Sequence, residues 1–170
     1  ADGEEEARHN GIHRFFLEKN SHVLYEEKHI GVGAGTGAKR IDPVTDIVLA
    51  EGAVMEMDTV QLGGVDSTLR KTTATVAARA KLLVRERIMT DGDETAKTEF
   101  EVSMDGEDSA VDLISRSVAK GNSCQEFLSV LNGKNRCTGH SECDAILADN
   151  GRVTAAPALD ASHVDAALIH

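Results

Sequence analysis

Short runs of alternating apolar and polar residues, separated by tight-turn pairs, dominate the second half of the chain. Phe100, Val102 and Met104 alternate with polar residues over 99–105, which is the two-residue period of a half-buried strand. Runs of similar length occupy 111–118, 125–131, 143–148, 153–159 and 164–169. The turn pairs are Asp91-Gly92, Asp105-Gly106, Gly121-Asn122, Asn132-Gly133 and Asn150-Gly151. This punctuation predicts an all-β fold.

Strands of this size fit two architectures, antiparallel hairpins in a sandwich or the rungs of a β-solenoid. The 170 residues include four Phe, one Tyr and no Trp, whereas sandwich cores usually contain large aromatic rings. Strands rich in Ala with few rings pack well as stacked layers, so we favour the solenoid. No linker divides the sequence, and we expect residues 1–170 to be one domain, part of a longer chain.

Two segments allow more than one interpretation. The composition of 74–89 suits a helix, but as a strand it places Arg79, Lys81, Arg85 and Arg87 on one face. We expect the strand, with a basic face that is either solvated or a docking site for an acidic partner. The glycine-rich stretch 31–37 lacks the spacing of a phosphate-binding loop and is expected to be an ordinary loop.

Charge and composition exclude several classes of protein. The chain has 18 Lys and Arg against 29 Asp and Glu, a net charge of -11, which disfavours nucleic acid and anionic membranes as partners. Its apolar runs fall far short of the roughly 20 residues needed to span a bilayer, and its start lacks the features of a signal peptide. Three cysteines without a secretory context predict reduced thiols in the cytoplasm.

One cluster has metal-ligand chemistry. Cys137, His140, Glu142 and Cys143 lie within seven residues and offer thiolate, imidazole and carboxylate groups suited to zinc or iron. Positions three apart on one strand face opposite ways, so these ligands converge only if the chain bends at 138–139. A structural zinc-binding module is therefore one hypothesis.

Several segments resemble the central core of the SufB/SufD family, the scaffold proteins of iron–sulfur cluster assembly in the SUF system. They are 113–121, 142–147, 157–159 and 166–170, with weaker support from 23–27 and 86–89. The resemblance implies a right-handed parallel β-helix (β-solenoid), without the family's flanking helical segments. It also implies a non-enzymatic scaffold that works with a SufC-type ABC ATPase, a second SufB/SufD-like subunit in a homo- or heterodimer, and a sulfur donor protein.

Carried over by position, the resemblance points to two residues. Cys143 matches the cysteine used to build the nascent iron–sulfur cluster, and His170 matches a histidine at the interface of two scaffold subunits. Near 27–30, where SufB proteins have a further sulfur-accepting cysteine, this chain offers only His29. A carbohydrate-active β-helix enzyme is the other alternative, but the chain has no Trp for sugar stacking and no evident pair of carboxylates.

Overall fold

Parallel strands wind into a β-solenoid in the computed structural model, which describes residues 7–30 and 39–170. The predicted loop at 31–37 lies outside these residues. The described part contains fourteen strands and no helix, and therefore no helix long and apolar enough to cross a membrane. The strands are β1 (Ala7–His9), β2 (Ile12–Leu17), β3 (His22–Ile30), β4 (Lys39–Ile41), β5 (Val44–Leu49), β6 (Val54–Leu62), β7 (Ser67–Val76), β8 (Lys81–Thr90), β9 (Thr95–Met104), β10 (Ser109–Ala119), β11 (Cys124–Gly133), β12 (Cys137–Leu147), β13 (Arg152–Ala161) and β14 (Ala166–Ile169).

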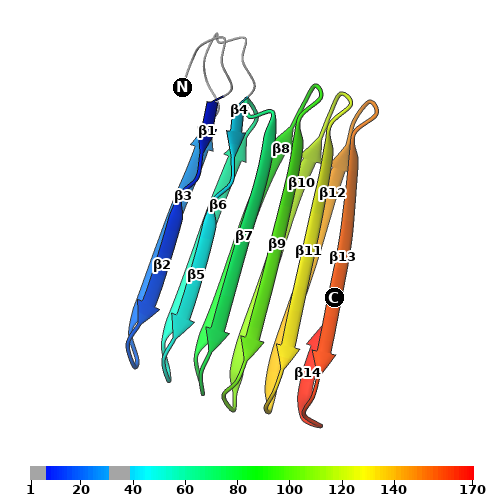
Figure 1. Ribbon diagram of the computed structural model, residues 1–170. Coiled ribbons are helices and arrows are strands. Elements are labelled where there is room, and N and C mark those ends of the chain that lie inside the picture. Colours follow the sequence, from blue (N-terminus) through cyan, green and yellow to red (C-terminus); the bar gives the residue numbers. More distant parts are fainter. Residues whose placement is uncertain (1–6, 31–38) are drawn as a thin grey trace.

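The strands form two sheets that face each other (Figure 1). One sheet has the order β14-β12-β10-β8-β6-β3, and the other contains β2, β5, β7, β9, β11 and β13 with the short β1 and β4. Each strand pairs in parallel with the strand one turn later, so that Ser109 lies beside Cys137. The all-β solenoid is thereby confirmed, and the antiparallel sandwich is excluded because a hairpin would pair consecutive strands.

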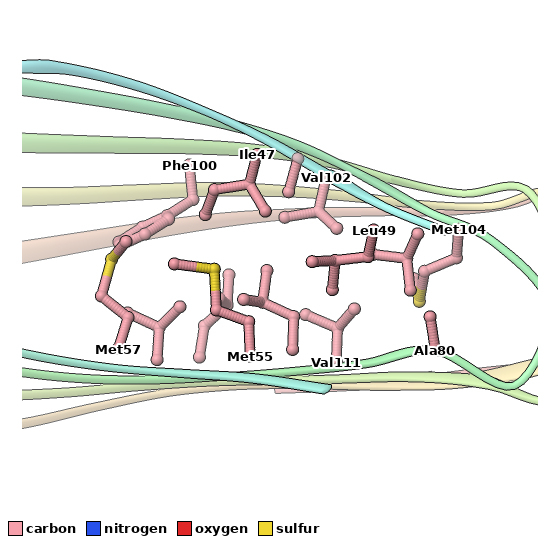
Figure 2. Close-up of a cluster of buried hydrophobic side chains, with 14 of the residues drawn as sticks. Ile47, Leu49, Met55, Met57, Ala80, Phe100, Val102, Met104 and Val111 are labelled. Atoms are coloured by element: carbon pink, nitrogen blue, oxygen red, sulfur yellow. The ribbon is translucent and has the colours of Figure 1, made fainter. Parts of the chain in front are cut away.

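The core fills the space between the sheets. Figure 2 shows Met55 and Met57 of β6 facing Ile47 and Phe100 from the other sheet. The Phe100 ring lies 5.9 Å from that of Phe127 on the next strand, a separation at which aromatic pairs attract. Small and aliphatic side chains supply the remainder of the core, which agrees with the composition.

Left-handed residues stack at the corners where the chain turns. Gly92, Gly121 and Asp149 have φ of 58°, 61° and 57°, and the N–H of Asn122 donates to the carbonyl oxygen of Gly92 over 2.8 Å. A Cβ on Gly121 would lie 2.7 Å from the backbone nitrogen of Gly92. The predicted turns are confirmed there, but the turn predicted at 132–133 falls later, at 134–136, because β11 continues through Gly133.

The prediction of one strand over 74–89 is wrong. β7 ends at Val76 and β8 begins at Lys81, and Arg79 sits in the turn between them with φ 56°. Arg79 belongs to a corner ion-pair ladder of alternating charge. The ladder consists of Lys19, Glu51, Arg79, Glu107 and Arg136, with N···O distances of 3.8 Å from Lys19 to Glu51, 3.8 Å from Arg79 to Glu107 and 3.5 Å from Arg136 to Glu107.

Candidate functional site

The cluster predicted from sequence lies on β12, which runs straight through 138–139. The inward positions of this strand hold Cys137, Gly139, Ser141 and Cys143, whereas His140 and Glu142 point outward. Six residues of extended chain separate the two thiols by about 20 Å. No group of three or more His, Cys, Asp or Glu residues is arranged to hold a metal ion within 7–30 and 39–170. The structure therefore does not bring the four predicted ligands together.

The outward pair instead makes contacts on the sheet surface. His140 Nδ1 lies 3.5 Å from Asp112 Oδ1, and its Nε2 lies 3.5 Å from Glu142 Oε2. His140 and Glu142 are thus neighbours two residues apart on one face of the strand.

Cys143 occupies a polar part of the interior. It packs against the edge of the hydrophobic core and hydrogen bonds with Ser115 and Ser117 of the neighbouring β10. Burial raises the pKa of the Cys143 thiol, the negative charge of Glu86 raises it further, and the bond to Ser115 opposes both effects. The thiol is consequently protonated at neutral pH.

Cys143 is the last member of a row of inward side chains that crosses the sheet, which we name the polar row. Strand register places Glu27 beside Thr59, Thr59 beside Glu86, Glu86 beside Ser115 and Ser115 beside Cys143. Glu86 is only 2% exposed. At about 4.8 Å per strand, the row spans about 19 Å.

The opposite sheet supplies partners for the two carboxylates of the polar row. Arg70 of β7 donates to Glu27 Oε2 over 3.0 Å, and Thr98 of β9 donates to Glu86 Oε1 over 2.9 Å. Glu86 Oε2 has no hydrogen-bond partner in the described part of the chain. Glu27 also pairs with His29.

The two buried glutamates differ in protonation. Burial raises the pKa of Glu86, and the Arg70 charge offsets this only in part. Burial would also raise the pKa of Glu27, but hydrogen bonding from His29 and the charge of Arg70 outweigh it and lower that pKa to about 2. The polar row therefore combines an ionised carboxylate at one end with a carboxyl that resists ionisation in the middle.

Sequence reasoning missed Arg70 and Glu86. A signal was present for Glu86, because it lies between Val84 and Ile88, on the face of the 74–89 segment opposite the basic residues. A charged residue at an inward position has to be paired or neutral. Arg70 could be recognised only from the arrangement of the strands, since its partner Glu27 is 43 residues away in the sequence.

His170 follows β14 directly and is exposed. β14 pairs with the first four residues of β12, ending with Ile169 beside His140. If this register continues, His170 lies one strand across from Ser141 and two residues along from Cys143. The Cα atoms of His170 and Cys143 are then about 8 Å apart. No hydrogen bond or ion pair joins their side chains in the part of the chain that the structure describes.

A protonated thiol at the end of a buried polar row is suited to binding a thiophilic metal or accepting sulfur once its proton is removed. Glu86 is a carboxyl of the same row, with an unpartnered oxygen. Fold and site together define a parallel β-solenoid with a partly buried thiol at the end of a row of inward polar side chains.

Comparison with known proteins narrows this class to a family. Residues 2–167 match the family described as SUF system FeS cluster assembly, SufBD core domain, and the chain belongs to that family. It is 24% identical over 163 residues to an iron–sulfur cluster assembly SufBD family protein of Archaeoglobus fulgidus. That alignment covers 95% of this chain and 43% of the relative, so the chain spans less than half of that protein's length.

Proposed function

We propose that this chain is a scaffold on which a nascent iron–sulfur cluster is assembled, with Cys143 as the residue that binds iron or accepts sulfur. The observation that supports this most directly is the position of Cys143 at the end of the polar row, hydrogen bonded to serine hydroxyls. Membership of an iron–sulfur cluster assembly family supplies the chemical context.

The chemistry requires that Cys143 lose a proton. When ferrous iron binds, an Fe–S bond forms, the S–H bond breaks and the proton leaves. Solvent takes this proton, because Cys143 is partly exposed. Glu86 is a poor acceptor, since it lies two strands away and burial disfavours its ionised form. Raising the pH therefore favours loading.

The second proposed ligand, His170, belongs to an interface with another subunit. Residues 141–147 of β12 have no strand beside them on the β14 side within the described part of the chain, and an unpaired edge favours pairing with another chain. We propose a second SufB/SufD-like subunit there, in a homo- or heterodimer, with His170 as a ligand or proton acceptor for the cluster.

We propose the remaining partners by analogy with the family. In this proposal the scaffold is not itself an enzyme: a SufC-type ABC ATPase hydrolyses ATP and a separate donor protein supplies sulfur, all in the cytoplasm. The net charge of -11 agrees with a function that involves neither nucleic acid nor an anionic membrane.

Anaerobic reconstitution with ferrous iron and sulfide tests the proposal, with visible absorption and metal analysis as readouts. We expect the wild-type chromophore to be lost in Cys143→Ala and reduced in His170→Ala. Cys124→Ala is the matched control, because it removes a thiol of similar exposure at the start of β11, away from the polar row. Equal chromophores in all four proteins would refute the proposal.

Two further variants, Cys137→Ala and His140→Ala, distinguish the zinc hypothesis from the scaffold proposal. Bound zinc in the purified protein that disappears in Cys137→Ala and His140→Ala, with an unchanged chromophore, would favour it instead. A zinc site would require a bend in β12 that the structure lacks.

A further inference from the structure

One outward row of the six-stranded sheet is entirely apolar, and we name it the apolar row. It consists of Ile30, Leu62, Met89, Val118 and Ile146, aligned by register across five strands. Ile30 is 51% exposed and Ile146 is 68% exposed. The other outward rows mix charged and apolar residues, as the row from Glu26 to Glu142 does. Solenoid faces in water are normally mixed in this way, so a continuous apolar row indicates a contact surface.

The neighbouring row contains two arginines side by side. Arg87 of β8 lies directly beside Arg116 of β10. Neither has a hydrogen bond or ion pair among residues 7–30 and 39–170, whereas Arg85 nearby is bound to Asp58 over 2.6 Å. Like charges directly opposite each other destabilise a sheet. Asp144 of β12 lies beside Arg116 on its other side and offsets part of this repulsion, but no acidic residue lies beside Arg87 in the row. An external carboxylate would compensate the remaining positive charge of the pair.

These two rows form a groove of about 410 Å³. Leu62, Met89, Val118 and Ile146 form its floor together with Val60. Arg87, Arg116 and Asp144 lie along one side. On its other side the strands end in turns that carry the exposed Asp91, Asp93 and Asp149. The groove is thus net positive on the strand side, where two arginines accompany one aspartate, and acidic on the turn side.

The spacing of the groove fits a helix better than an extended peptide. Neighbouring strands present apolar side chains about every 4.8 Å. An α-helix repeats a side chain on one face about every 5.4 Å, and an extended strand does so only every 6.6 Å. The five members of the apolar row span about 19 Å, which matches about 13 helical residues.

We propose that this groove binds an amphipathic α-helix of a partner protein. The helix places its apolar stripe on the apolar row and carboxylates on the flank that faces Arg87 and Arg116. The proposal uses the outer face of the sheet and does not depend on the role of Cys143 inside it.

Two labelled 16-residue helical peptides test this on the full chain by fluorescence anisotropy. Both carry leucines at helical spacing, one with glutamates along a single flank and the other with lysines at the same positions. We expect the glutamate peptide to bind at least about tenfold more tightly than the lysine peptide at low salt. We expect Arg87→Glu combined with Arg116→Glu to reverse this preference, and Met89→Ser to weaken binding of both peptides.

Arg14→Glu is the matched control, because Arg14 is an exposed arginine on β2 of the other sheet. It should leave the preference unchanged, and circular dichroism should show all variants folded. Equal binding of the two peptides, no binding of either, or a preference unaffected by the Arg87/Arg116 change would each overturn the proposal. A wild-type dimer in sedimentation that Met89→Ser dissociates would overturn it too, because the occupant would then be a second copy of this chain.

Discussion

Replacing Glu86 with Gln isolates the contribution of a buried carboxyl to stability. The side chain is 2% exposed, accepts one hydrogen bond from Thr98 and leaves Oε2 without a partner. Burial raises its pKa above the ordinary value of 4.5. Gln has nearly the same shape and can still accept the Thr98 bond, but it carries no charge at any pH.

The sign of the pH effect follows from linkage. Because the folded-state pKa is the higher one, the folded protein binds more protons than the unfolded chain between pH 4.5 and that pKa. The stability contributed by the protonated Glu86 is fully present below pH 4.5 and is lost as the pH rises through the folded-state pKa. One proton changes the free energy of unfolding by at most about 1.4 kcal/mol per pH unit.

Urea unfolding of both proteins from pH 4 to pH 8, followed by circular dichroism, measures this effect. We expect the stability of Glu86→Gln relative to wild type to rise with pH, by up to about 1.4 kcal/mol per unit in the titrating range. Glu101→Gln, on the exposed face of β9, serves as the control and should show no such slope. Parallel pH profiles for wild type and Glu86→Gln would refute the assignment of Glu86 as a destabilising buried carboxylate.

Three further changes test other parts of the structure by the same urea assay. Glu27→Gln should lower the free energy of unfolding by about 3 kcal/mol at neutral pH, because the folded-state pKa of Glu27 near 2 stabilises the folded protein above pH 4.5. This cost should vanish as the pH falls through 2. A cost that does not change with pH would contradict the pairing of Glu27 with Arg70. Phe100→Ala should cost about 3–5 kcal/mol, and a loss below about 1 kcal/mol would show that its ring is not buried against Phe127. Gly106→Ala places a Cβ 1.8 Å from the backbone nitrogen of Ala78 and should strongly destabilise the fold. Gly92→Ala is the comparison: its Cβ meets nothing within 4 Å, and it should cost about 1 kcal/mol because of the positive φ of Gly92. Equal effects of the two changes would show that the 105–108 corner is packed differently.

The all-β fold and most of its turns were predictable because Asp-Gly and Asn-Gly pairs favour tight turns. Asn132-Gly133 is an exception, since β11 continues through it. The turn at 77–80 was not predictable, since it contains neither Gly nor Pro. Arg79 adopts a left-handed conformation there because adjacent turns hold it: its N–H donates to the carbonyl oxygen of Glu107 over 2.9 Å. Tertiary contacts thus overrode local preference.

The candidate site was predictable only in part. The alternation of a strand already implied that His140 and Cys143 face opposite ways, and the structure agrees. The polar row was beyond sequence reasoning because it depends on register between strands, and the chain has no literal repeat from which the register can be read. Glu86 and Arg70 become recognisable as a group only when the turns are stacked.

The corner ion-pair ladder has a consequence for the order in which the turns stack. Its exposed pairs each contribute at most about 1 kcal/mol and weaken in salt, so they add little to overall stability. Their alternating signs nevertheless disfavour a folding error in which one turn is skipped. If the folding chain skipped the turn of Arg79, Glu51 would meet Glu107, and if it skipped the turn of Glu107, Arg79 would meet Arg136. Either mistake would replace an attraction with a repulsion at this corner. Low salt should therefore favour correct winding, and high salt should allow more misaligned chains during refolding.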